Sequence, residues 1–291
     1  MAVTGPYIRP ADLSVALEIL TAEPDRRIVA GGTDHYPARV QPMPEDRILD
    51  VTGIAGLRGI SVKDGVVRIG ATTTWSDIRN AADLPPAFDG LKAAAAEVGG
   101  RQIQNRGTLA GNLCNASPAA DGIPPLLSLD AQVVLNGLPG ARRLPLSDFL
   151  TGYRKTARAA GELLTAVEVP LPQSADRGGF VKLGARHYLV ISIAMVAAVL
   201  KPDASDRIAQ AAVSVGACGP VACRLPELEA ALVGADLADD LGERVTDAHL
   251  SVLSPIDDPR ASAAYRRDAA ATLVRRLLTD LSAGYDAKEA A

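Results

Sequence analysis

The stretch that most constrains the fold of this chain is the segment from Arg101 to Leu127, RQIQNRGTLAGNLCNASPAADGIPPLL. It lies between two apolar segments, but its glycines and short polar side chains make it too polar for a core. Glycine adopts backbone angles closed to other residues and lets a ligand approach the main chain closely. Amides in such a loop can hold a phosphate, especially beside a helix N-terminus. The segment predicts a phosphate-binding loop, with an ordinary surface loop as the alternative.

A second glycine pair, in Gly31-Gly32-Thr33-Asp34, directly follows a short strand predicted over residues 27–30. It lacks the third glycine of the Rossmann dinucleotide fingerprint. Two glycine loops on separate strands favour a diphosphate held between two lobes. The side chains that they offer are neutral donors and one or two carboxylates, which suits main-chain binding of a pyrophosphate. The chain has no GxxxxGK[ST] motif, so an ATPase is disfavoured.

Composition excludes several classes of protein. The net charge is −4 and no basic cluster stands out, so neither nucleic acid nor an acidic membrane is an expected partner. The first ten residues do not resemble a signal peptide, and the longest apolar window, residues 188–200, is too short for a membrane helix. We therefore expect a soluble, cytoplasmic protein.

The chain offers few groups for catalysis or metal binding. Its three cysteines, Cys114, Cys218 and Cys223, form no CxxC motif, so this chain alone is not expected to hold zinc or an iron–sulfur cluster. No acid–base pair or activated nucleophile is recognisable. A bound cofactor must therefore carry any reaction.

Periodicity predicts an α+β chain with a boundary in the linker-like residues 171–179. Before the boundary we expect helices over residues 13–23, 75–82 and 91–98, and strands over 27–30, 48–51, 66–70, 131–135 and 162–169. After it we expect three antiparallel strands, 180–183, 192–200 and 208–215, followed by helices 226–232, 239–248 and 261–281.

Four blocks of sequence, in order, are similar to the FAD-binding medium subunit of the molybdenum hydroxylases, the family of the xanthine dehydrogenases and carbon monoxide dehydrogenase. They are Val29-Ala-Gly-Gly-Thr-Asp34, the segment Asn105–Asp121, Glu162–Pro170 and Phe180–Arg186. The resemblance covers most of residues 5–280. It implies a vanillyl-alcohol-oxidase-like FAD domain of the PCMH type over residues 1–173, with lobes of about 1–55 and 56–173. A small α+β domain over 177–282 and a frayed tail, 283–291, would follow.

The resemblance also implies which residues bind FAD. From the first lobe, Val29, Ala30, Gly31, Gly32, Thr33 and Asp34 would line the diphosphate. From the second lobe Thr108, Gly111, Asn112 and Asn115 would do so, with Asp121 near the ribityl or ribose hydroxyls. Leu163 and Leu164 would lie against the adenine or the flavin edge.

Two further positions carry alternatives. Lys182 would lie near the isoalloxazine ring, where a cation stabilises charge on the reduced flavin, or it is a surface lysine at a strand edge. Tyr188 would cover the flavin face, or it only packs. The chain departs from the family pattern at Ala110, where many members have glycine, and at His35, where an aliphatic residue is common.

By this resemblance the chain is the flavin subunit of a multi-subunit molybdenum hydroxylase. Electrons would come from two [2Fe–2S] clusters of a small partner subunit, after hydroxylation of a purine, another N-heterocycle or an aldehyde at a molybdopterin in a large partner. They would pass to NAD+, dioxygen or another acceptor, in an assembly expected to be a dimer of heterotrimers. The alternatives are a stand-alone FAD oxidase or reductase of the same fold, and a nucleotide-binding regulatory or scaffold protein without redox chemistry.

Overall fold

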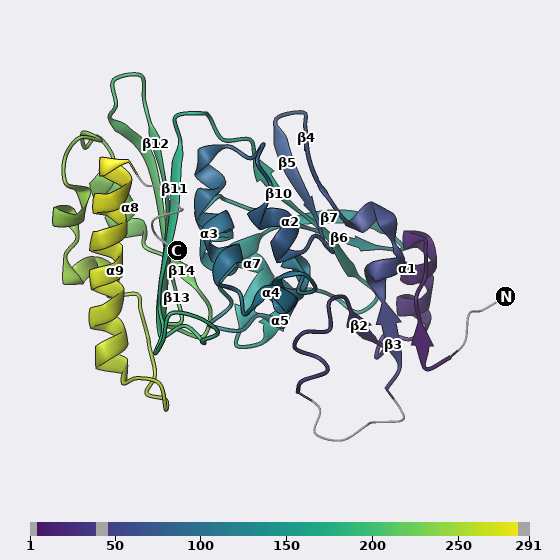
Figure 1. Cartoon of the computed structure of the whole chain (residues 1–291). Coiled ribbons are helices and arrows are strands. Elements are labelled where there is room, and N and C mark those ends of the chain that lie inside the picture. Colours follow the sequence, from purple (N-terminus) through teal and green to yellow (C-terminus); the bar gives the residue numbers. More distant parts are fainter. Residues whose placement is uncertain (1–4, 39–45, 285–291) are drawn as a thin grey trace.

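The N-terminal lobe is a small parallel sheet covered by one helix (Figure 1). The computed structural model describes residues 5–38 and 46–284. The sheet has the order β1-β3-β2, and the helix α1 buries Ala16, Leu17 and Leu20. The predicted helix and both predicted strands are confirmed. The elements are β1 (Tyr7–Ile8), α1 (Leu13–Ala22), β2 (Arg27–Val29) and β3 (Ile48–Asp50), followed by two 3-10 turns, η1 (Val51–Gly53) and η2 (Ala55–Leu57).

The second lobe is built on an antiparallel sheet of order β4-β5-β10-β6-β7. Its strands are β4 (Ile60–Lys63), β5 (Val66–Gly70), β6 (Gln132–Gly137), β7 (Gly140–Pro145) and β10 (Leu163–Pro170). The central three strands match the predicted ones. The two edge strands were missed because both are largely exposed: β4 has only four residues, and β7 contains Arg142 and Arg143. A separate hairpin joins β8 (Leu150–Gly152) and β9 (Lys155–Thr156).

Helices of the second lobe form the layer between this sheet and the C-terminal domain. They are α2 (Trp75–Arg79), η3 (Pro86–Phe88), α3 (Asp89–Glu97), α4 (Arg101–Gln104), α5 (Leu109–Asn115), α6 (Ile123–Ser128) and α7 (Leu146–Phe149). The segment 101–127, expected to be a loop outside the core, is therefore mostly helical. Leu109, Leu113 and Leu126 are fully buried in it. Its small polar residues cap and join short helices whose apolar faces enter the core.

The C-terminal domain is a four-stranded antiparallel sheet with helices on both faces. The strands β11 (Arg177–Leu183), β12 (Ala194–Pro202) and β13 (Ile208–Gly216) were predicted, and the two-residue β14 (Cys223–Arg224) was not. The long helix α9 (Ala263–Ala283) covers one face, and α3 and α6 of the second lobe pack on the other (Figure 1). A further helix, α8 (Pro226–Leu232), follows β14.

The predicted helix over 239–248 is wrong. The chain forms two 3-10 turns there, η4 (Leu241–Arg244) and η5 (Asp247–Leu250). Gly242 lies against α9 so closely that an added Cβ would be 2.5 Å from the carbonyl oxygen of Arg275. The β-branched Val245 and Thr246 separate the turns, and the packing of α9 outweighs the local helical pattern.

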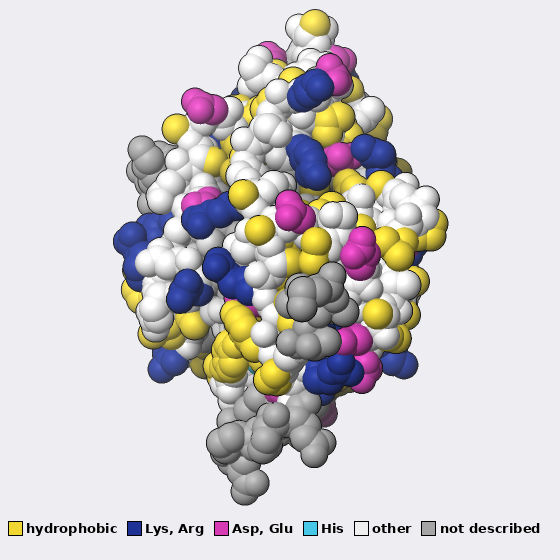
Figure 2. Space-filling model, turned by 90° about the vertical axis from the view of Figure 1, so that its right-hand side faces the viewer, with side chains coloured by type: hydrophobic (Ala, Val, Ile, Leu, Met, Phe, Trp, Pro, Cys, Tyr) yellow, Lys and Arg dark blue, Asp and Glu magenta, His cyan; other side chains and the backbone are white. Residues whose placement is uncertain are grey.

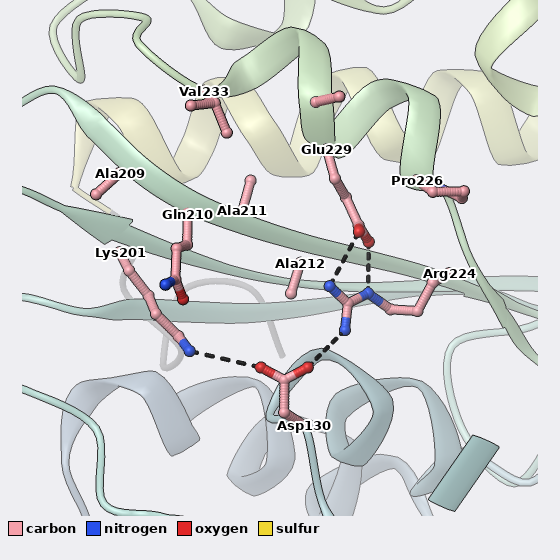
Figure 3. Close-up of a pocket in the computed structure, with 11 residues that line it drawn as sticks. Asp130, Lys201, Ala209, Gln210, Ala211, Ala212, Arg224, Pro226, Glu229 and Val233 are labelled. Carbon is pink, nitrogen blue, oxygen red and sulfur yellow. Dashed lines mark hydrogen bonds and ion pairs between the residues drawn. The ribbon is translucent and has the colours of Figure 1, made fainter. Parts of the chain in front are cut away.

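A cluster of charged side chains joins α6 to the C-terminal sheet (Figure 3). Asp130 lies 3.5 Å from the Lys201 Nζ and 2.8 Å from an Arg224 nitrogen, and Arg224 also pairs with Glu229 at 2.5 Å. These side chains line a pocket of about 360 Å³. Their charges are paired with one another, and none of the predicted site residues lies in this pocket. We therefore regard it as part of the contact between domains.

The face of the N-terminal lobe carries mixed charge. Figure 2 shows Lys and Arg side chains interspersed with Asp and Glu over this face. In the described part of the chain, no helix combines the length and apolar character needed to cross a bilayer.

Candidate cofactor site

The two predicted glycine loops lie against each other. Gly31, at the end of β2, is so close to the turn before α5 that an added Cβ would lie 1.8 Å from the carbonyl oxygen of Arg106 and 3.0 Å from the nitrogen of Gly107. Only glycine allows this approach. Gly32 has φ +69°, in the left-handed region that favours glycine. A glycine loop from each lobe therefore lies at this contact between the lobes.

The main chain of the first loop has free donors. Among the described residues, the N–H groups of Gly31, Gly32, Thr33 and Asp34 donate no hydrogen bond. Gly31, Gly32 and Thr33 are half-buried, and Asp34 is exposed. Consecutive free amides in a turn form a site for an anion such as a phosphate. This part of the prediction fits the structure.

The second loop is arranged differently from the expectation. The Thr108 side chain caps α5 by accepting from the Gly111 N–H at 3.1 Å, and the Asn112 N–H donates to the Thr108 carbonyl at 3.1 Å. The N–H groups of Gly111 and Asn112 are therefore not free to donate to a phosphate. The buried Asn112 Oδ1, in contrast, has no partner within the described ranges, and it offers an acceptor for a ligand hydroxyl.

The side chain of Trp75 accounts for the presence of glycine at two positions of the second loop, where the sequence suggested that glycine lets a ligand come close. Its indole is buried at 1% exposure, with Gly107 on one side and Gly122 on the other. A Cβ on Gly107 would lie 3.2 Å from the Trp75 ring, and one on Gly122 would lie 2.4 Å from it. These glycines are therefore required for packing around Trp75, and the packed indole fixes both ends of the second loop.

Arg154 links the two loops, and it was not among the site residues predicted from the sequence. One of its terminal nitrogens donates to Asn115 Oδ1 at 2.7 Å and lies 3.5 Å from Asp34 Oδ2. Arg154 lies in the turn of the β8–β9 hairpin. Hydrogen bonding to Tyr153, followed by the charge of Asp34, raises the pKa of this guanidinium despite partial burial.

Asp121 and Lys182 form a buried ion pair at the contact between domains. Asp121 Oδ2 is 2.7 Å from the Lys182 Nζ, and Oδ1 accepts from the Ser192 hydroxyl at 2.6 Å. The side chains are 9% and 5% exposed, so the surface-lysine alternative is wrong. Burial raises the pKa of Asp121, and the positive charge of Lys182 opposes that shift. The expected contact of Asp121 with a ribityl or ribose hydroxyl stays a prediction.

A pocket of about 340 Å³ opens beside Lys182. Its lining includes Glu97 of α3, Phe180 of β11 and His187 of the following loop. Tyr188 is 64% exposed and its ring meets that of His187 edge-on, so its contact with a flavin face stays a prediction and its packing alternative stays open. Binding of a ring system in this pocket stays a prediction.

The remaining predicted residues are in or near the core. Val29 is buried, and Ala30 is half-buried beside the first loop. Leu163 and Leu164 are 3% and 2% exposed in β10. They contribute to two different apolar clusters, because successive strand residues point to opposite faces. Contact of either leucine with a ligand stays a prediction.

Two family models match the chain in succession. The model described as the FAD binding domain in molybdopterin dehydrogenase matches residues 2–172, and the one described as the CO dehydrogenase flavoprotein C-terminal domain matches residues 180–281. The nicotinate dehydrogenase FAD-subunit of Eubacterium barkeri is 30% identical over 87% of this chain and 87% of its own length. The putative xanthine dehydrogenase FAD-binding subunit of Escherichia coli K12 is 29% identical over 97% of each chain.

Solved structures agree with the sequence comparisons. A chain of a Cu,Mo-dependent CO dehydrogenase superposes with a TM-score of 0.87 and 28% identity, covering 95% of this chain and 97% of that one. A chain of quinoline 2-oxidoreductase from Pseudomonas putida 86 gives a TM-score of 0.84 and 27% identity, covering 97% and 98%. The predicted fold, a PCMH-type FAD domain followed by a small α+β domain, is confirmed.

Proposed function

This chain belongs to the family of FAD-binding subunits of molybdenum hydroxylases, and we propose that it takes electrons from iron–sulfur clusters of a partner subunit onto FAD. The chain is thus an oxidoreductase subunit with its own FAD-binding domain. The observation that carries the proposal is the contact of Gly31 with the turn at Arg106 and Gly107. This contact brings loops from both lobes within reach of one diphosphate.

The side chains and amides present fit FAD. We propose that the free amides of residues 31–34 bind the diphosphate, that the Asn112 Oδ1 accepts from a hydroxyl, and that the pocket beside Lys182 receives the ring system. FAD, when bound, supplies the redox chemistry, since it accepts and releases electrons. The chain orients it, and Lys182 holds a positive charge at the pocket. The proposed site also includes the remaining predicted residues, which are Val29, Ala30, Thr108, Asn115, Asp121, Leu163, Leu164 and Tyr188.

The proposal extends to partners and substrate class. We place the molybdopterin in a large subunit and two [2Fe–2S] clusters in a small one, as a dimer of heterotrimers. The names of similar proteins, which include nicotinate, xanthine and quinoline enzymes, favour an N-heterocycle such as a purine as the substrate, with an aldehyde as the second choice. NAD+, dioxygen or another carrier would accept the electrons. Residues 1–173 and 177–282 would form the two domains.

Anaerobic mixing separates this electron relay from a stand-alone oxidase or reductase. The purified FAD-loaded chain is mixed with xanthine, nicotinate and an aldehyde, and the flavin absorbance is followed. We expect no bleaching by the chain alone and bleaching after the two partner subunits are added. Bleaching by the chain alone contradicts the relay and establishes direct oxidation of the substrate.

A further inference from the structure

We propose that Arg154 is a cofactor-binding residue, whose guanidinium faces the diphosphate held by the first glycine loop. The inference rests on the proposed function, because it requires a dinucleotide at this site. It differs from the sequence-based expectation, in which only main-chain amides and neutral side chains meet the phosphates. It concerns one residue, in the β8–β9 hairpin, about 40 positions beyond the second loop.

Arg154 is held by both loops at once. One terminal nitrogen donates to Asn115 Oδ1 at 2.7 Å and approaches Asp34 Oδ2 at 3.5 Å. Asn115 ends α5, and Asp34 lies in the turn with the free amides. A guanidinium has five N–H donors in a planar fork, and these contacts use the donors of one nitrogen. A side-chain hydrogen bond to Tyr153 uses part of the remaining fork, and its other N–H donors are available for an anionic group beside the loops.

The backbone at Arg154 indicates that its side chain is needed there. Its φ is +51°, a left-handed conformation that is unfavourable for residues with a Cβ. Glycine is the usual residue at such a turn position. The conformation is held because the Arg154 N–H donates to the carbonyl oxygen of Ala116 at 3.0 Å, just past α5. An arginine here has a local cost, and a functional side chain gives a reason for it.

Charge gives a second, independent argument. The Asp34 carboxylate is 59% exposed and lies in the same turn as the amides that would receive the diphosphate. The negative charges of the Asp34 carboxylate and a diphosphate in this turn would repel each other, and this repulsion would weaken binding of the diphosphate. Arg154 neutralises Asp34 and adds a charge-assisted donor for phosphate. Lys155, the next residue in the hairpin, is exposed and forms no ion pair within the described ranges, so it provides a matched control.

The test is titration of flavin-free full-length chain with FAD, followed by flavin fluorescence at low and high salt. We expect Arg154→Gln to raise the Kd by roughly 10- to 100-fold, since a charged hydrogen-bond partner is lost. Arg154→Lys recovers part of the affinity, because it keeps the charge but not the fork. Lys155→Gln stays within about twofold of the unmodified chain. The affinity of the unmodified chain falls more steeply with salt than that of Arg154→Gln.

Three outcomes overturn the inference. One is an Arg154→Gln Kd within about twofold of the unmodified value. Another is that Arg154→Gln and Arg154→Lys weaken FAD binding equally, keep the salt dependence of the unmodified chain and lower the Tm of the flavin-free protein. In that case Arg154 is only a structural link between the loops. The third is an unmodified chain that binds no FAD, which contradicts the proposed function as well. The first two leave the proposed function standing, so the two failures are distinguishable.

Discussion

Gly31 is the residue at which the first glycine loop contacts the second lobe, and its lack of a side chain allows this contact. The sequence indicated that Gly31 belongs to a loop that approaches a ligand closely, and the structure brings it against Arg106 and Gly107. The local pattern identified the need for glycine but not the neighbour that imposes it. That neighbour lies about 75 residues away, and periodicity contains no information on such a contact.

Gly31→Ala should disrupt the site. The added methyl group would lie 1.8 Å from the Arg106 carbonyl oxygen, so the loops must separate. We expect a loss of stability of about 1–3 kcal/mol, as for overpacked positions, and an FAD affinity at least tenfold weaker. Urea unfolding and FAD titration measure the two effects. Gly56→Ala is the control, since an added Cβ there meets no atom within 4 Å. Equal behaviour of the two variants would contradict the proposed contact between loops.

For Asp121 and Lys182, the sequence predicted that both residues belong to the site but did not predict that they pair with each other. The sequence indicated that both residues belong to the site, but it assigned each of them to the cofactor. The structure pairs them with each other across the domain contact, 61 residues apart in the chain. Pairing of this kind depends on the packing of α3 and α6 against β11, which local sequence patterns do not specify.

Single substitutions in this pair should be more harmful than the double substitution. Asp121→Ala or Lys182→Met leaves one buried charge without its partner, at a cost of about 3–5 kcal/mol. The double variant removes both charges, so we expect it to be more stable than either single variant. Urea unfolding of the four proteins gives the coupling free energy. Additive losses of stability would show that the two charges do not stabilise each other.

At the scale of elements, apolar periodicity identified the buried strands and the long helix. It failed where exposure or tertiary packing decides the conformation. The edge strands β4 and β7 are short and largely exposed, so their sequences carry little signal from burial. The segment 239–248 has a helical pattern, but Gly242 must fit against α9, and two 3-10 turns form instead.

The loop before α9 should give the protein a measurable acid sensitivity. Burial disfavours the charged form of Asp258, but hydrogen bonds from the Arg260 N–H and the Arg266 guanidinium outweigh it and lower the pKa to about 2, from 3.8. A lowered carboxyl pKa adds stability above the unfolded value, and that stability is lost as the pH falls through the folded value. The contribution is about 2 kcal/mol, lost between about pH 4 and pH 2.

Asp258→Asn tests this linkage. The variant should be less stable than the unmodified chain at about pH 5, and the difference should shrink steadily toward about pH 2. Urea unfolding at several pH values measures it. A difference in stability that does not change with pH would show that the carboxylate charge does not anchor this loop to Arg266.

At the scale of the whole molecule, the two predicted domains are joined by an apolar cluster to which both contribute, although the C-terminal domain also has a cluster of its own. The cluster that contains Phe88 and Leu91 of the second lobe also contains three residues of the C-terminal domain, Val199, Ala212 and Ala222. The order of the four sequence blocks was sufficient to predict the fold. Helices α2 and α3 of the middle layer were predicted, but the position of the layer between the two sheets was not. Which sheet faces α3 and α6 cover depends on contacts between distant segments.

A fragment ending at residue 173 should therefore not fold alone. Removing β11–β13 exposes the apolar faces of α3 and α6, which pack on these strands in the full chain. We expect the fragment to aggregate or to unfold without cooperativity, as seen by size-exclusion chromatography and urea titration, while the full chain remains monodisperse. A monomeric fragment with a cooperative transition would contradict a shared core.

The most direct test of the central claim is a calorimetric titration of the flavin-free chain with FAD, riboflavin and ADP. The account places one dinucleotide between two loops, with its diphosphate bound by the free amides of residues 31–34. It therefore predicts one FAD per chain, displacement of FAD by ADP, and riboflavin binding at least about 100-fold weaker than FAD, because riboflavin lacks every phosphate contact. Riboflavin that binds as tightly as FAD, or ADP that fails to compete, would contradict it.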